Sequence, residues 1–320
     1  MIVRLGYVAL PLDLEDCSPS KTITYKNYSK ITDYKLKLDK VIDLTKINLE
    51  NTARILKHNL SKDIRIYRIT SKLVPLSTHP NAIKWNYVGK LKMYYKKISD
   101  IIKTNNMRVS SHPDIFNVLN SPKENVIYST IDTLIYQDII LSAFDLEPSY
   151  GKLIMHVGGK YDKKETSMNR FITNFDRLPS RIKNRIVLEN DDKIYNIKDT
   201  LTLSKKLNIP MVLDVHHHWC NNDGLALEDY LYDIFSTWDN QPLTPKIHLS
   251  SPKSTKDYRS HSDYINFDDF NNFLKLAKKM NIDFDVMIEA KKKNLALYKL
   301  MSDIKNNTSY KIIDDASFIV

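Results

Sequence analysis

Short apolar runs alternate with longer amphipathic segments along the whole chain. Eight of the runs are rich in β-branched residues and are too short for buried helices, so they are predicted to be strands. These runs are VRLGYVAL (3–10), IRIYRIT (64–70), MRVSS (107–111), KLIMHVGG (152–159), RIVLEND (185–191), PMVLDV (210–215), KIHLSS (246–251) and FDVMIEA (284–290). Each is followed by a segment whose apolar residues have helical spacing, most clearly over 91–102, 200–207 and 267–280.

Eight strand-then-helix units predict a parallel sheet that closes into a (β/α)8 barrel, the TIM-barrel fold. One domain spanning residues 1–320 is expected, because barrels of this kind exceed the usual domain size. The alternative is an open, doubly wound sheet. Both folds bind their ligands at the carboxyl ends of the strands, so candidate functional residues are expected there.

Histidines gather at the predicted strand ends. The chain has nine histidines, and only His58 falls on a predicted helix. The other eight lie in or just after the strands, and they are His79, His112, His156, His216, His217, His218, His248 and His261. Three carboxylates, Glu189, Asp214 and Glu289, also fall at strand ends. A lone strand histidine is usually a hydrogen-bonded core residue, but chance would scatter such a set over both ends of a barrel.

Buried carboxylates cost several kcal/mol each unless cations compensate them, so this cluster predicts bound metal ions. Imidazole and carboxylate together suit zinc, manganese or iron. So many candidate ligands predict two or three ions, an arrangement that stabilises the attacking and leaving oxygens in phosphoester hydrolysis. In the stretch LDVHHH, Asp214 is the strand-end ligand, and spacing does not choose among the three histidines. Cys220 is a less favoured ligand.

The charge balance indicates an anionic partner. Lysine and arginine outnumber aspartate and glutamate by 48 to 38, a net charge of +10. Nucleic acid is the commonest such partner, although a lysine-rich proteome would give the same balance. Basic residues that follow the strand ends, and are expected to meet phosphates, are Lys160, Lys163, Lys253, Lys256, Arg259, Lys291, Lys292 and Lys293.

The composition also bears on location and assembly. Two cysteines, Cys17 and Cys220, imply no disulfide framework. No apolar run approaches the roughly 20 residues that span a bilayer, and no secretory leader is recognisable. We therefore expect a cytoplasmic monomer with no membrane association and no obligate protein partner.

Ten sequence blocks, most of them at strand ends, resemble the UV-damage endonuclease family. They are RLGYVA (4–9), SPSKT (18–22), YRITSKLVPLSTH (67–79), SSHP with NVLNSP (110–122), HVGGKYDKK (156–164), VLENDD (187–192), LDVHHH (213–218), PKIHLSS (245–251), HSDYI (261–265) and DVMIEAKKK (285–293). The resemblance implies a metal-dependent barrel that cuts damaged double-stranded DNA on the 5′ side of cyclobutane dimers, 6-4 photoproducts and other lesions. It also implies a 3′-hydroxyl product and two to three divalent ions, with manganese favoured over zinc or magnesium.

The same resemblance implies roles for individual residues. The implied metal ligands are His79, His112, His156, Glu189, Asp214, His217, His248, His261 and Glu289. The family spacing D-x-x-H selects His217, and Glu189, Glu289 and Lys246 are the implied catalytic residues. Lys246 lies two residues before His248 on the same strand, so it is expected to point towards the ions. A neutral or carboxylated lysine is favoured there, and the alternative is a lysine that reaches a DNA phosphate.

One block departs from the family pattern. The family reads His-Pro-Gly/Asp-Gln-Tyr, whereas this chain reads HPDIF and places Ile115 and Phe116 where the lesion-probing pair is expected. Phe116 keeps a stacking face and Ile115 can act as an apolar wedge, but the amide and phenol are lost. Tyr7 is a second candidate for the lesion pocket, and Lys292 and Lys293 are the expected phosphate contacts.

Three other functions compete with this hypothesis. Sugar isomerases and epimerases also use barrels with strand-end metals, but they need fewer ligands and no basic rim. Abasic-site endonucleases have a comparable trinuclear site. A DNA-binding barrel without catalysis is disfavoured by the intact ligand set.

Overall fold

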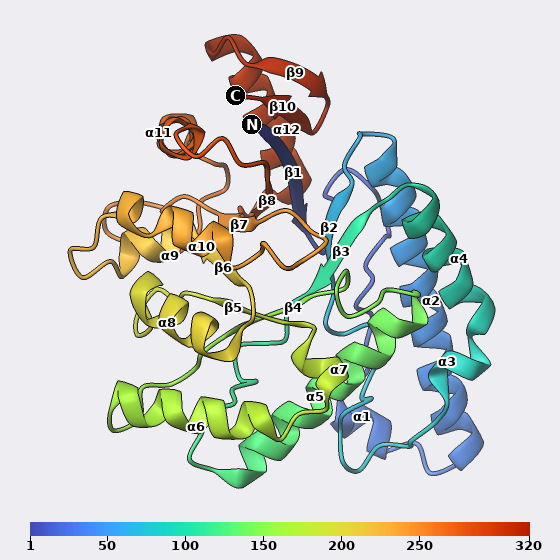
Figure 1. Ribbon diagram of the computed structural model, residues 1–320. Helices are drawn as coiled ribbons and strands as arrows, with labels where there is room; N and C mark the ends of the chain where they lie inside the picture. Colours follow the sequence, from blue (N-terminus) through green and yellow to red (C-terminus); the bar gives the residue numbers. More distant parts are fainter.

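Eight parallel strands, one from each predicted apolar run, close into a barrel in the computed structural model, which describes residues 1–320 (Figure 1). The strands are β1 (Ile2–Val8), β2 (Ile66–Ile69), β3 (Arg108–Ser111), β4 (Leu153–His156), β5 (Ile186–Glu189), β6 (Met211–Asp214), β7 (Lys246–Leu249) and β8 (Phe284–Ile288). Each pairs with its neighbours in chain order, and β1 pairs with both β8 and β2. The predicted (β/α)8 barrel is therefore confirmed, and the open sheet is excluded.

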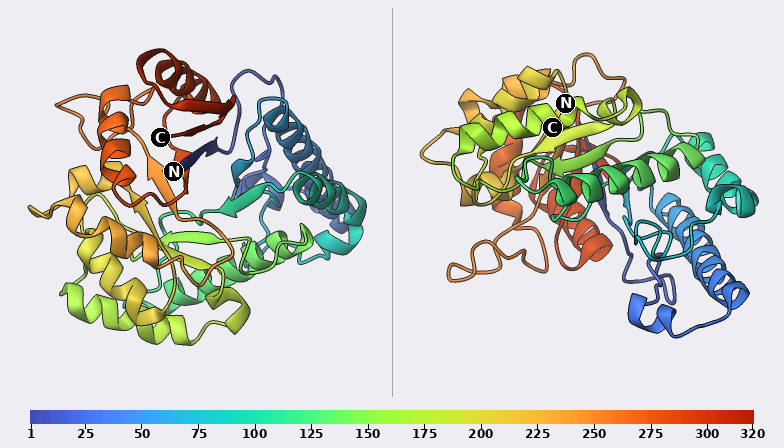
Figure 2. Two further views of the ribbon diagram at one scale, coloured as in Figure 1. Left: turned by 45° about the horizontal axis from the view of Figure 1, so that its top comes forward. Right: turned by 90° about the horizontal axis from the view of Figure 1, so that it is seen from below.

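Helices follow the strands and cover the outside of the barrel (Figure 2). Three begin and end close to the predicted ranges: α4 (Lys92–Thr104), α8 (Ile197–Leu207) and α11 (Phe267–Lys278). The others are α1 (Tyr25–Ser29), α2 (Tyr34–Leu60), α3 (Tyr87–Lys90), α5 (Glu124–Ala143), α6 (Lys164–Asp176), α7 (Ser180–Lys183), α9 (Val215–Cys220), α10 (Leu231–Ser236) and α12 (Lys293–Asn307). Local sequence sets their ends, as in α8, where Asn196 and Asp199 form a capping box and Asn208 adopts a left-handed conformation. No helix has the length and apolar character that a membrane span requires.

The two faces of the barrel strands differ in chemistry. The outward side chains join the helices in one apolar core of 65 buried residues. Inside the barrel, the apolar cluster is small and consists of Ile154, Val187 and Val212 closed off by Trp238. Arg108 and Asp285 form a buried ion pair lower in the interior. The barrel lumen is thus largely polar, and its charged residues set the environment of the site above.

A hairpin at the end of the chain was not predicted. Strands β9 (Lys311–Asp314) and β10 (Ser317–Ile319) extend the sheet to ten strands, and β10 pairs antiparallel with the first residues of β1. The pairing of β1 with β2 begins only at Gly6, so the earlier part of β1 is free to pair with β10. Such short strands are marginal alone, and this tertiary pairing stabilises them. It also brings the two termini together, with Val320 N donating to Met1 O at 3.0 Å.

Candidate metal centre

Seven of the nine predicted ligands converge at the carboxyl ends of the strands. They form three overlapping groups, in each of which the ligand atoms lie within 4.8 Å of one another. The groups are His112–His156–Glu189, Glu189–Asp214–His217 and Glu189–His248–Glu289. Glu189, at the end of β5, belongs to all three and is 1% exposed. Below, these seven residues are called the ligand cluster.

Glu189 is surrounded by imidazoles. His248 Nδ1 lies 2.7 Å from its Oε1, and His112 Nε2 lies 3.0 Å from its Oε2. Burial by itself raises the pKa of Glu189, but the charges on His248 and His156, with the hydrogen bond from His112, hold that pKa well below its usual range. Glu189 is therefore held as a carboxylate, the form in which it could bind a cation.

Three histidines are oriented by backbone carbonyls. A carbonyl oxygen only accepts hydrogen bonds, so the Nδ1 atom beside it carries a proton, and Nε2 is the nitrogen that can bind a metal ion. In His112, that role requires loss of the Nε2 proton that is donated to Glu189. This support from residues behind the ligands is typical of metal-binding histidines. The pairs are His112 Nδ1 with Pro113 O at 2.9 Å, His217 Nδ1 with Asn190 O at 2.9 Å, and His261 Nδ1 with Glu289 O at 2.7 Å.

The structure separates the three consecutive histidines. Asp214 caps α9 by accepting from His217 N at 2.7 Å, and this tight turn brings His217 back over the strand ends. His216 is fully buried with both ring nitrogens satisfied: Nε2 donates to Tyr258 O at 2.8 Å, and Nδ1 accepts from Ser250 Oγ at 2.9 Å. His218 lines a separate cavity beside α11. Only His217 of the three lies in the ligand cluster.

The cluster carries unsatisfied polar atoms that a cation would satisfy. His156 Nδ1, Asp214 Oδ2 and His248 Nε2 are buried and have no hydrogen-bond partner. Burial raises the pKa of Asp214 to about 8 despite the nearby His217, and the charges of Glu189 and Glu289 add to the rise. Orphaned buried groups of this kind are costly. The donor set of imidazoles and carboxylates thus fits divalent metal ions.

Two predicted ligands lie outside the ligand cluster. The ring of His261 is centred 6.4 Å from that of His217, so His261 borders the cluster. His79 is in the loop after β2, where its ring stacks on Tyr25 at 4.0 Å and its Nδ1 accepts from Asn81 N at 3.2 Å. The structure therefore does not bring His79 to the cluster.

The prediction that Tyr7 lines the lesion pocket is wrong. Tyr7 is 0% exposed, and its hydroxyl donates to Asn59 Oδ1 on α2 at 2.5 Å. Its ring meets Tyr67 edge-on. The side chain points from β1 into the helical layer, away from the barrel lumen, so Tyr7 is a packing residue.

Lys246 lies inside the barrel beneath the ligands. It is 2% exposed, and its Nζ donates to Ser110 Oγ at 3.0 Å. Burial, reinforced by the charge of Arg108, lowers the pKa of Lys246 well below its usual range. A lysine in this position does not reach a DNA phosphate, so that alternative is wrong, and its environment favours an uncharged form.

The predicted DNA-contacting residues differ in exposure. Ile115 and Phe116, in the loop after β3, are 68% and 82% exposed although both are large and apolar. Lys292 and Lys293 are half-buried at the start of α12. Burial and the neighbouring Arg68 lower the pKa of Lys293.

Arg68 was missed by the sequence-based prediction. It lies on β2 and forms an ion pair with Glu289. Burial by itself raises the pKa of Glu289, but the Arg68 guanidinium holds it at about 2. The signal was present in the sequence, because Arg68 lies between Tyr67 and Ile69 in a predicted barrel strand, and an arginine inside a buried strand is unusual.

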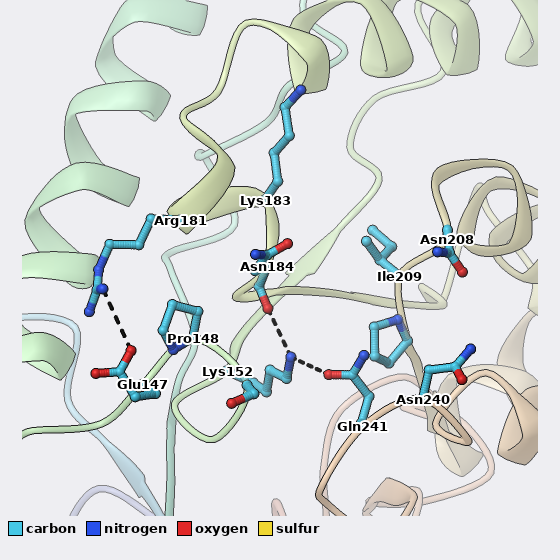
Figure 3. A pocket seen from close by; sticks show the side chains of 12 residues that line it. Glu147, Pro148, Lys152, Arg181, Lys183, Asn184, Asn208, Ile209, Asn240 and Gln241 are labelled. Carbon is cyan, nitrogen blue, oxygen red and sulfur yellow. Dashed lines mark hydrogen bonds and ion pairs between the residues drawn. The ribbon is translucent and has the colours of Figure 1, made fainter.

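A polar cavity of about 580 Å³ lies at the opposite end of the barrel (Figure 3). Lys152 lies between Asn184 O at 2.8 Å and Gln241 Oε1 at 2.6 Å, and it donates to both. The lining contains no histidine and none of the cluster carboxylates. Residues at this end of a barrel generally serve stability, and Lys152 ties together the segments that precede β5 and β7.

Comparisons with known proteins agree with this geometry. The family described as UV-endonuclease UvdE matches residues 3–317. The UV DNA damage endonuclease of Bacillus cereus (strain 03BB102) is 40% identical over 317 residues, covering 99% of each chain. The crystal structure of SacUVDE has a TM-score of 0.84 and 35% identity, and the match covers 95% of this chain and 98% of that one. The 3-keto-D-glucoside 4-epimerase YcjR from E. coli, with a TM-score of 0.55 and 12% identity, shares only the fold. This chain belongs to the UvdE family of UV endonucleases.

Proposed function

We propose that this protein is a DNA repair endonuclease that hydrolyses the phosphodiester bond on the 5′ side of ultraviolet photoproducts and leaves a 3′-hydroxyl. The observation that carries the proposal is the convergence of six imidazole and carboxylate side chains around Glu189 in a member of this family. A sugar epimerase needs no such number of ligands, and the barrel shared with YcjR reflects the fold alone.

The ligand cluster would hold two or three divalent ions, with manganese the favoured metal. Such ions supply Lewis-acid polarisation of a phosphoryl oxygen and lower the pKa of a bound water. Glu189 contributes a charge shared by all three ligand groups. The carbonyls behind His112 and His217 fix the ring orientations, so little reorganisation is needed when substrate binds.

DNA would approach the rim from the side of the HPDIF loop. Ile115 and Phe116 are free to insert into a base step that the lesion has already weakened. Exposed basic side chains on the loops after the strands would contact the phosphates on either side. They are Lys160, Lys163, Lys253, Lys256, Arg259 and Lys291.

Neutralising Lys292 and Lys293 together should weaken the binding of damaged and undamaged DNA alike. Each lost phosphate contact should reduce the slope of log affinity against log salt concentration by about 0.9. Binding titrations at several salt concentrations measure this slope. The matched control is a double alanine variant at Lys305 and Lys311, which are exposed near the other end of α12 and on β9. If the two double variants have equal salt slopes, Lys292 and Lys293 do not contact DNA phosphates.

The direct test is incision of a duplex that carries one cyclobutane dimer at a defined position. We expect a single cut on the 5′ side of the dimer and a 3′ end that a DNA polymerase can extend. The activity should be lost when divalent metal ions are chelated and restored by manganese. A duplex with an abasic site serves as the second arm. Cleavage of the abasic duplex alone would replace the proposal with an abasic-site endonuclease.

A further inference from the structure

The ring of ligands is open on one side of the barrel. Strands β3 to β8 and the residues just after them supply all seven members of the ligand cluster, whereas β1 and β2 supply none. The single charged residue of β1, Arg4, pairs with Asp285 near the start of β8. Arg68 on β2 instead reaches up to Glu289, beside the ligands. Arg68 is therefore the charged side chain that β1 and β2 contribute next to the ligand cluster.

Arg68 has hydrogen-bonding capacity to spare. A guanidinium carries five N–H donors in a planar fork, and Arg68 uses Nη1 to hold Glu289 Oε1. No further hydrogen bond from its side chain is formed, and none of its nitrogens is a buried atom without a partner. Its side chain is 17% exposed. The remaining donors are thus open to the mouth of the barrel.

Arg68 also creates a cationic edge opposite the carboxylates. Lys293, at the start of α12, follows Glu289 by four residues and so lies on the same rim, and the charge of Arg68 contributes to lowering its pKa. When no ion is bound, a phosphodiester that approaches the ligand cluster meets the negative charges of Glu189 and Glu289. An arginine on the open side offsets this repulsion, and its fork matches phosphate oxygens geometrically.

The geometry points to Arg68 as a phosphate-binding residue of this site, which holds Glu289 with one N–H and presents its free N–H groups to the phosphodiester of the strand to be cut. This role rests on the proposed endonuclease function. It accounts for how the substrate is bound on the side of β1 and β2, which supply no residue to the ligand cluster.

The test compares Arg68→Met and Arg68→Lys with wild type. For Arg68→Met we expect kcat to fall about tenfold. This is the lower end of the cost of losing a hydrogen bond between charged groups, and we expect the lower end because Lys293 remains nearby as a second cation. Arg68→Lys should recover part of this loss, since it keeps the charge but not the fork. In metal-depleted protein, Arg68→Met should lower the salt slope of DNA binding by about 0.9. Manganese affinity should stay equal or increase, because Arg68 and an ion share Glu289.

The matched control is Arg4→Met. It breaks the ion pair between Arg4 on β1 and Asp285 on β8, which lies at the end of the barrel remote from the ligand cluster. It should leave the salt slope and kcat unchanged. Loss of manganese binding in Arg68→Met would overturn the inference, since Arg68 would then only position Glu289. An unchanged slope with unchanged kcat would also overturn it. If wild type fails to incise the dimer duplex, the proposed function fails, whereas the salt slope and metal affinity still decide whether Arg68 contacts phosphate.

Discussion

Replacing Glu189 with Gln is expected to slow incision of a dimer-containing duplex by about a thousandfold or more. This is the scale of rate loss when a group that stabilises the transition state is removed, and Glu189 would do so by holding the metal ions. Glu189 belongs to all three ligand groups, so one substitution removes charge from every predicted ion position. An amide nitrogen would also replace one of the two oxygens that face His112 and His248. The measurement is single-turnover incision together with the metal content of the purified protein.

The Glu189→Gln protein should remain folded. Glutamine has nearly the volume of glutamate, so the substitution removes charge from the ligand cluster and no core packing, and losing the carboxylate that the imidazoles stabilise should lower the unfolding temperature only modestly. Thermal unfolding of the metal-depleted proteins checks this point. The matched control is Glu147→Gln, at an exposed carboxylate beside Arg181 at the other end of the barrel. Near-normal incision by the Glu189 variant would rule out the assignment of the metal centre.

Phe116→Ala should reduce affinity for a dimer-containing duplex by about ten- to a hundredfold, because stacking of a base on an aromatic ring contributes roughly 1–3 kcal/mol. Phe116 is 82% exposed and fills no part of the core, so the variant should unfold at the same temperature as wild type. Binding is measured under metal-depleted conditions, in which no cutting occurs. Undamaged duplex should bind wild type and variant almost equally.

Ile115→Gln completes this experiment by restoring the amide of the family pattern. It should raise affinity modestly or broaden the range of lesions bound, because an unpaired base regains a polar partner. Tyr232→Ala is the control, since Tyr232 is also a largely exposed aromatic residue but lies on α10. If Phe116→Ala binds the lesion as well as wild type, the HPDIF loop is not the lesion probe. Tyr7 could not take its place, because it is fully buried.

The sequence was sufficient to predict the barrel because its strands are nearly continuous apolar runs, separated by segments whose apolar residues have helical spacing. The same feature hid which face of a strand lines the lumen. In β1, Val3, Leu5 and Tyr7 alternate with Arg4 and Gly6, which shows that the three share a face but not that this face packs against the helices. Tyr7 was placed at the site because it lies in the block RLGYVA near the end of the first strand, whereas it packs against α2. The hairpin of β9 and β10 was missed because its strands are stabilised only by pairing with β1, about 315 residues earlier in the chain.

Much of the ligand cluster followed from one rule, that the carboxyl ends of parallel strands meet at one end of a barrel. His112, Glu189 and Glu289 satisfy it because each lies at or next to the end of its strand. His79 follows its strand by ten residues, so the rule no longer constrains it, and the loop turns it towards Tyr25.

The sequence by itself determined the fold, the family and the end of the barrel at which the chemistry is placed, because these depend on local spacing and on residue types at strand ends. Only the tertiary structure decided that Nδ1 of His112, His217 and His261 faces a backbone carbonyl, that His216 is a satisfied core residue, and that Lys246 is buried against Ser110. It also revealed the pairing of Arg68 with Glu289, across 221 residues of chain. Hydrogen bonds and ion pairs of this kind depend on distances of a few ångströms between segments remote in sequence, and neither periodicity nor composition records those distances.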